Sequence, residues 1–120
     1  MIYDCNYLSY VVAETLRLDA SVPFSSRLTI TEDVTLECGY KLKQGHSFAI
    51  HIHYLHHNPS QWITPEEFIP ERFDPTSPYY LTPDGKKRHP MSYGPFLGGR
   101  RICLGKTFGE NIGKCIIALI

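Results

Sequence analysis

Cys103 is the residue of this 120-residue chain whose surroundings most strongly favour chemistry. It lies in the run FLGGRRICLG at positions 96–105, with Arg101 two residues before it and glycines on both sides. Apolar residues recur at helical spacing directly after this run, so we expect a helix whose N-terminal end lies close to the thiol. A helix N-terminus and a nearby guanidinium both favour the thiolate, the form of cysteine that binds a metal. We therefore interpret Cys103 as a metal ligand and not as a buried structural cysteine.

The residues around Cys103 predict a bulky ligand that carries negative charge. Flanking glycines allow the backbone to approach a large group closely, and they let main-chain amides turn toward the sulfur. In extended backbone, a residue two positions before another projects to the same side. Arg101 is therefore expected to reach an anionic edge of whatever Cys103 binds.

The run at 96–105 resembles the F-x-x-G-x-R-x-C-x-G haem-binding motif of the cytochrome P-450 family, the haem-thiolate monooxygenases. Three other segments resemble motifs of the same family in the same order. They are the E-x-x-R helix at 14–17, the H-x-[DN]-P-x-x-W stretch within 55–62, and the P-E-R-F segment at 70–73. Because four ordered motifs are much more specific than one, the chain is identified as similar to the C-terminal haem-binding portion of a member.

The resemblance implies a cofactor and a set of residues around it. The cofactor would be haem b, with Cys103 as the axial ligand of the iron. Arg27 and Arg101 would contact the haem propionates. The residues implied to shape the loop around the sulfur are Phe96, Gly99 and Gly105. No catalytic residue beyond the ligand is implied here, because the family's oxygen-activating helix precedes the portion that this chain resembles.

The activity implied by the resemblance is a monooxygenation. A thiolate ligand donates electron density to haem iron and favours O–O bond cleavage. One oxygen atom from O2 would enter a small apolar organic substrate, with electrons supplied by a reductase. The implied location is the cytoplasmic face of the endoplasmic-reticulum membrane, through an N-terminal anchor that is not among these residues. Because the chain resembles only about the last third of a member, we expect it to be inactive alone.

Glu14 and Arg17 lie three positions apart on a predicted helix, so they can form an ion pair. An exposed pair of this kind contributes only about 0.2–0.5 kcal/mol to helix stability. The resemblance implies instead that Arg72 joins them in a buried triad. Such a triad would connect the helix to the irregular segment that leads into the cysteine loop.

The pattern of elements predicts a mainly α fold with a small β-sheet (α+β), forming one partial domain over residues 1–120. A helix is expected to begin around residues 4–6 and to end before Pro23. Alternating residues predict strands near 26–31, 34–36 and 40–42, and a longer one over 47–54. The sequence TPEE at 64–67 predicts a capping box that opens a short helical turn. The Pro-rich segment 70–95 is expected to be irregular.

Composition narrows the class of protein without defining it. Twelve basic and twelve acidic residues give no net charge, so nothing indicates a nucleic-acid partner. The short basic run KKR at 86–88 is interpreted as a solvated loop. Four cysteines form no C-x-x-C pair, which is typical of a reducing compartment. No apolar stretch approaches the length of a membrane span.

Two alternatives compete with this interpretation. His51, His53 and His56 approximate the H-x-H-x-D-H site of binuclear metallo-hydrolases, and imidazoles on one strand face could hold zinc. Leu55 replaces the aspartate that such a site needs. The second alternative is a truncated, non-catalytic product that lacks most of a haem pocket.

Overall fold

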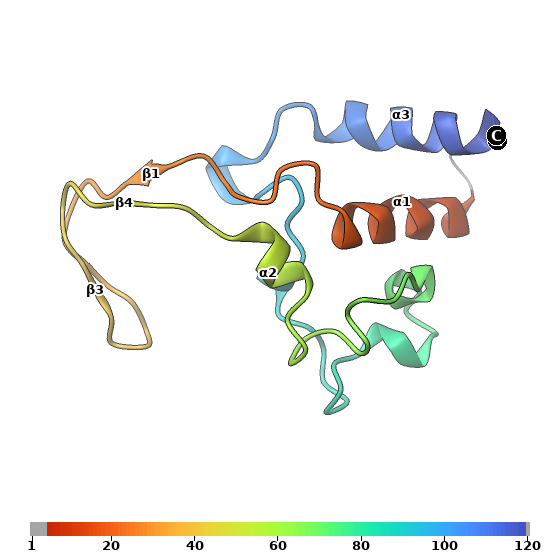
Figure 1. Cartoon of the computed structure of the whole chain (residues 1–120), viewed down its shortest axis with the longest axis horizontal. Helices are drawn as coiled ribbons and strands as arrows, with labels where there is room; N and C mark the ends of the chain where they lie inside the picture. The colour runs from red at the N-terminus through yellow and green to blue at the C-terminus, as the bar shows by residue number, and fades with distance from the viewer. Residues whose placement is uncertain (1–4, 120) are drawn as a thin grey trace.

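The structure is a computed structural model that describes residues 5–119. Within that range two long helices lie side by side, and small antiparallel strand pairs extend away from one end of them (Figure 1). The helices are α1 (Asn6–Leu18), α2 (Ile52–His56) and α3 (Lys106–Leu119). The strands are β1 (Leu28–Thr29), β2 (Val34–Thr35), β3 (Lys41–Leu42) and β4 (Ser47–Phe48). The prediction of a mainly helical fold with a small β component is confirmed.

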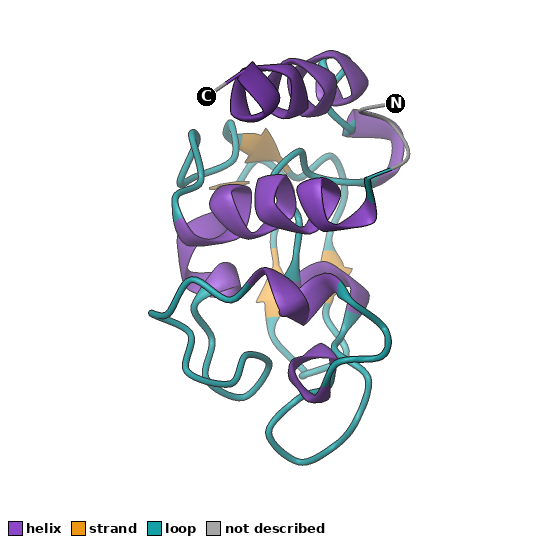
Figure 2. Ribbon diagram, turned by 90° about the vertical axis from the view of Figure 1, so that its right-hand side faces the viewer, coloured by secondary structure: helices purple, strands orange, loops and turns teal. Residues whose placement is uncertain are grey.

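Helix α1 has the position that the sequence predicts. It begins at Asn6 and ends at Leu18. The next residue, Asp19, donates its backbone N–H to the Thr15 carbonyl. The earlier predicted start at position 4 lies outside the described residues. Figure 2 shows α1 between α3 on one side and the irregular segment on the other, so α1 is the central element of the chain.

The strands are shorter than predicted. β1 pairs with β4, so that Leu28 lies opposite Phe48, and β2 pairs with β3 in a hairpin. Gly39 has a φ of +84° in the turn of that hairpin, a conformation that favours glycine. Each strand contains two residues.

The predicted long strand over 47–54 is wrong beyond Phe48. From Ile52 the chain turns into helix α2, which the His51 side chain caps by accepting a hydrogen bond from the Tyr54 amide. Ile52 and His56, four residues apart, are the buried positions, whereas Tyr54 is exposed. The alternation of apolar residues therefore did not mark the buried face, which follows the helical spacing of four.

The predicted helical turn at 64–67 is also wrong. Thr64 has a φ of +42°, whereas the capping residue of a helix needs extended backbone. The segment forms a single turn in which the Glu67 amide donates to the Thr64 carbonyl. Several carbonyl groups of this turn point inward to buried arginines, and these bonds replace helical ones.

The segment 70–95 consists of loops with short 3₁₀ turns, as predicted. These turns are η2 (Pro70–Phe73), η3 (Pro78–Tyr80) and η4 (Pro90–Ser92), and each begins with a proline. A further 3₁₀ turn, η5 (Gly99–Arg101), precedes the cysteine. Among residues 5–119, no helix is long and apolar enough to cross a membrane.

The interior is unusually polar for a small protein. Among the described residues, the buried apolar side chains are those of Val12, Ile52 and Trp62. The other large side chains that are fully buried are those of Glu14, Arg17, His56 and Arg72. Since a buried charge is costly unless it is paired and hydrogen-bonded, these side chains require specific partners.

Candidate functional site

Cys103 lies in a loop that ends at the N-terminus of α3. Its backbone N–H donates to the Phe96 carbonyl at 2.9 Å, which closes the loop 96–103. Its own carbonyl accepts from the Lys106 amide at 3.3 Å, where α3 begins. The thiol is exposed, so its sulfur is accessible to a ligand. Gly99 has a φ of +64° within this loop, which explains the preference for glycine there.

The cysteine forms part of the wall of an apolar cavity of about 250 Å³. Leu16 of α1 and Ile52 of α2 line it together with the loop residues 95–97. Arg101 lines the same cavity as Cys103, as its spacing predicts. The backbone reason for that prediction was wrong, because residues 99–101 form the 3₁₀ turn η5 and not an extended segment.

Two arginines from distant parts of the chain lie on the wall of a neighbouring cavity. A second cavity of about 720 Å³ is lined by both Arg27 and Arg101. Both side chains are exposed, and neither forms an ion pair with a carboxylate of residues 5–119. The structure therefore brings a thiol and two available guanidinium groups to one region, which suits a ligand with anionic substituents.

The residues of the predicted triad are in direct contact, and all three are fully buried. Arg17 donates from Nε to Glu14 Oε2 at 2.7 Å and from Nη2 to Oε1 at 2.9 Å. Arg72 donates from Nε to Glu14 Oε1 at 3.0 Å. The Ile69 amide donates to the same oxygen at 2.9 Å, so the carboxylate is fully hydrogen-bonded.

One carboxylate cannot balance two guanidinium groups, and backbone carbonyl groups supply the remaining acceptors. Arg17 donates to carbonyl oxygens at 2.8–3.1 Å, and Arg72 donates to others from both of its terminal nitrogens. The residues whose carbonyl oxygens accept these bonds are His56, Ile63, Thr64, Pro65 and Glu67. Burial lowers the pKa of Arg72, and the Glu14 carboxylate opposes that effect. The triad thus fixes α1, α2 and the turn at 63–67 to one another.

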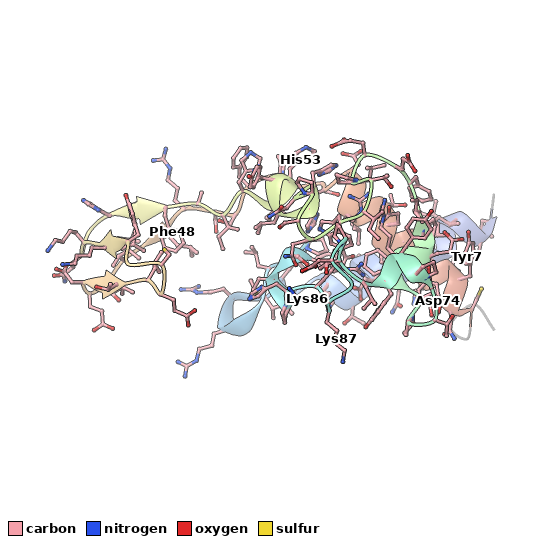
Figure 3. The ribbon with its side chains drawn as sticks, turned by 90° about the horizontal axis from the view of Figure 1, so that it is seen from below. Tyr7, Phe48, His53, Asp74, Lys86 and Lys87 are labelled. Atoms are coloured by element: carbon pink, nitrogen blue, oxygen red, sulfur yellow. The ribbon has the colours of Figure 1, made fainter. Side chains whose placement is uncertain are left out.

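Arg88 is a site residue that the sequence analysis missed, because it ends a basic run interpreted as a solvated loop. Lys86 and Lys87 are exposed, as Figure 3 shows, but the Arg88 guanidinium lies over the buried Trp62 ring at 4.3 Å. It donates to the carbonyl oxygens of Tyr79 and Arg72 at 2.9 and 2.5 Å. Burial, and then the charge of Arg72, lower the pKa of Arg88 to about 10. The nearby aromatic residues were the available signal, since arginine commonly stacks on such rings.

The histidine cluster does not form the zinc site that the sequence allowed. Because 52–56 is a helix, His53 points to the surface (Figure 3) while His56 points into the interior. His56 is fully buried and binds backbone groups through both ring nitrogens. Nδ1 of His51 accepts from the Tyr54 amide. Over residues 5–119 no group of three or more His, Cys, Asp or Glu side chains is arranged to hold a metal.

Comparison with known proteins agrees with this geometry. The family model described as Cytochrome P450 matches residues 1–120. Probable cytochrome P450 4p2 of Drosophila melanogaster is 39% identical over 115 residues, which are 96% of this chain and 21% of that protein. Cytochrome P450 4A2 of Rattus norvegicus is 41% identical over 113 residues, covering 94% of this chain and 20% of that protein.

The same similarity extends to solved structures. The crystal structure of the cytochrome P450DA heme domain superposes with a TM-score of 0.82 at 28% sequence identity, covering 99% of this chain and 24% of that one. The chain spans about a fifth of the length of the curated relatives, which is less than the third that the motifs suggested. With a family match over the whole chain and a shared fold, the chain belongs to the cytochrome P450 family.

Proposed function

We propose that the protein containing this chain is a haem-thiolate monooxygenase and that this segment supplies the thiolate ligand of the iron. The observation that supports the proposal most directly is the exposed Cys103 thiol at the start of α3, on the wall of an apolar cavity. Zinc hydrolysis has no comparable support, because one of its three histidines is buried and fully hydrogen-bonded.

Haem b fits the side chains that the segment offers. The sulfur of Cys103 suits iron, and the cavity walls suit the apolar face of a porphyrin. Arg27 and Arg101 have no carboxylate partner within the described residues and suit the two propionates. A thiolate-ligated haem supplies oxygen activation, because the thiolate donates electron density that favours O–O bond cleavage.

The residues of this chain would hold the sulfur in place. Phe96 fixes the Cys103 amide through its carbonyl group, and its ring lies against α3, where a β-carbon added at Gly109 would be 3.7 Å from it. Gly105 borders the sulfur, since a β-carbon there would lie in ordinary contact with Sγ at 3.8 Å. The triad would fix the elements that carry these residues, and no proton-transfer residue is assigned to this segment.

We further propose a small apolar organic substrate, O2 as co-substrate and a reductase as electron donor. Val22, which lines the cavity beside Cys103, and the neighbouring Phe24 are both at least half exposed and would give the substrate an apolar surface. One relative is named taurochenodeoxycholic 6 alpha-hydroxylase, from Sus scrofa, and is 38% identical over 94% of this chain. That name supports hydroxylation of a largely hydrocarbon molecule. The endoplasmic-reticulum membrane is the proposed location.

The reduced carbon monoxide spectrum of the full-length protein tests this proposal. A thiolate-ligated haem gives a strongly red-shifted Soret band, which Cys103→Ser should abolish. Cys115→Ser is the matched control, because Cys115 is also exposed but lies on the body of α3. Retention of the band in Cys103→Ser, or its loss only in Cys115→Ser, would refute the assignment.

A further inference from the structure

His56 is a buried titratable residue to which neither the ligand loop nor the triad gives a role. Its side chain lies at the junction of α1, α2 and the start of the loop that carries Cys103. We propose that His56 is a positioning residue that fixes the cysteine loop to helix α1 through one specific ring tautomer. The inference rests on the proposed haem site, but its contacts stand independently of any cofactor.

The contacts of His56 determine which ring nitrogen carries the proton. The Gly94 backbone N–H can only donate, and it lies 3.0 Å from Nε2, so Nε2 must be the acceptor. Nδ1 lies 3.1 Å from the Arg17 carbonyl oxygen, which can only accept. Nδ1 therefore carries the proton, and the neutral Nδ1–H tautomer is the one form that satisfies both partners.

The contact with Arg17 is reciprocal. The His56 ring donates to the Arg17 carbonyl, while the Arg17 side chain donates to the His56 carbonyl at 2.9 Å. The Arg17 carbonyl, which lies in the last turn of α1, thus gains a hydrogen-bond partner outside the helix. The ring also stacks on Tyr93, with centroids 5.3 Å apart and planes 25° apart, and the Tyr93 hydroxyl donates to the Ala13 carbonyl of α1. The ring therefore has one orientation.

A short chain of hydrogen bonds leads from His56 to the cysteine. The Gly94 amide donates to His56 Nε2, and the Gly94 carbonyl accepts from the Leu97 amide at 3.0 Å. The turn 94–97 places Phe96, whose carbonyl accepts from the Cys103 amide at 2.9 Å. Leu97 has a φ of +60°, which is strained for leucine and persists only where surrounding contacts hold the turn. Loss of the Gly94 contact would therefore loosen the turn that orients the cysteine.

Two substitutions distinguish the proposed hydrogen-bonding role of His56 from a role in packing alone. His56→Phe keeps an aromatic ring against Tyr93 but removes both hydrogen bonds. His56→Gln provides a side-chain oxygen that can reach the Gly94 amide. The matched control is His53→Phe, because His53 lies on the same helix but points to the surface (Figure 3).

Hydrogen exchange at the Gly94 amide of the full-length holoprotein is the first measurement. His56→Phe should accelerate this exchange about tenfold or more, since a buried donor loses its partner. His56→Gln should restore protection, and His53→Phe should leave it unchanged. Unchanged protection in His56→Phe would overturn the inference, and so would loss of protection in a folded His56→Gln variant. The result for His56→Gln tests the inference even if His56→Phe does not fold.

The reduced carbon monoxide spectrum is the second measurement. The fraction of haem with the red-shifted thiolate band should fall in His56→Phe and recover in His56→Gln. An equal thiolate fraction in wild type and in His56→Phe would contradict a positioning role. If the wild-type protein shows no thiolate band, the proposed function fails, whereas the exchange data still decide whether His56 holds Gly94.

Discussion

Arg72 is held by a carboxylate and by carbonyl groups at the same time. Its Nε bonds to Glu14, while its terminal nitrogens bond to three carbonyl oxygens in 63–67. This arrangement requires the planar fork of a guanidinium, because an ammonium group cannot reach several fixed acceptors in that geometry. We therefore attribute the conformation of the 63–67 turn to Arg72 together with Arg17, which binds the Pro65 and Glu67 carbonyl groups.

Arg72→Ala should reduce the free energy of unfolding of the holoprotein by about 3–5 kcal/mol, because Glu14 loses one of its two guanidinium partners and the buried carbonyl groups bound to Arg72 lose their donor. Arg72→Lys should recover only a minor part of this loss. Denaturant unfolding monitored by circular dichroism and haem absorbance measures both. Lys87→Ala is the control, since Lys87 is exposed. Wild-type stability and normal haem content in Arg72→Ala would contradict a stabilising role for the triad.

His56 gives stability a pH dependence in a defined window. Burial is the main cause that lowers its pKa from 6.5 to about 4 in the folded protein. Between these values the unfolded chain binds a proton that the folded chain does not, so stability rises with pH. The contribution is complete above pH 6.5 and is lost as pH falls toward 4. Protonation of His56 would also put a hydrogen on Nε2, so that two N–H donors would face each other and the bond from the Gly94 amide would be lost.

The size of this effect should be about 3 kcal/mol between pH 6.5 and 4. Unfolding free energies of wild type and His56→Gln across that range provide the test, since glutamine does not titrate. Charged and titratable groups near the ring are Arg17, His53, His57 and Tyr93. Hydrogen bonds lower the pKa values of Asp33, Asp74 and Asp84 below 3.8, so these groups act only at lower pH. Identical pH slopes in both proteins would exclude His56 as the cause.

At the scale of elements, α3 packs on α1 through Gly113, which faces the buried Val12. A β-carbon built at Gly113 would lie 3.5 Å from Cγ1 of the buried Val12, which is an ordinary contact. A methyl group therefore fits between the helices, and we expect a longer side chain at this position to press against Val12.

Gly113→Ala should keep or raise stability, by up to about 1 kcal/mol, because alanine favours helix. Gly113→Leu should cost about 1–3 kcal/mol through overpacking against Val12. Thermal unfolding of the two holoprotein variants beside wild type distinguishes these effects. A destabilised Gly113→Ala, or a Gly113→Leu variant as stable as wild type, would contradict the described contact.

The sequence predicted the elements that depend on local pattern and missed those that depend on distant partners. Helix α1, and the place of Cys103 just before helix α3, followed from spacing and from motifs. The helix at 52–56 did not, because its buried face is set by His56 binding Arg17 and Gly94, which are distant in the chain. The turn at 63–67 was mistaken for the same reason, since its carbonyl groups serve Arg17 and Arg72. The residues of 64–67 themselves give no indication of those partners.

At the scale of the whole molecule, the chain is extended and leaves much apolar surface uncovered. Its radius of gyration is 16.3 Å, whereas a compact chain of this length would have about 14 Å. Exposed apolar side chains are concentrated on and before α3, and they include Leu104, Phe108, Ile112, Ile116 and Leu119. Surfaces of this kind normally pack against further protein.

Residues 1–120 produced alone should therefore bind a hydrophobic dye and self-associate, whereas the full-length holoprotein should do neither to the same degree. Dye fluorescence and size-exclusion chromatography at matched concentrations compare the two. A monomeric fragment without dye binding would show that the apolar face of α3 needs no cover.

X-ray absorption at the iron edge of the purified full-length protein tests the central claim most directly, because it identifies the atoms bound to iron. We predict one sulfur neighbour in the wild-type protein and in Cys115→Ser, and none in Cys103→Ser. A sulfur neighbour that persists in Cys103→Ser, or a wild-type iron with only nitrogen and oxygen neighbours, would contradict the account.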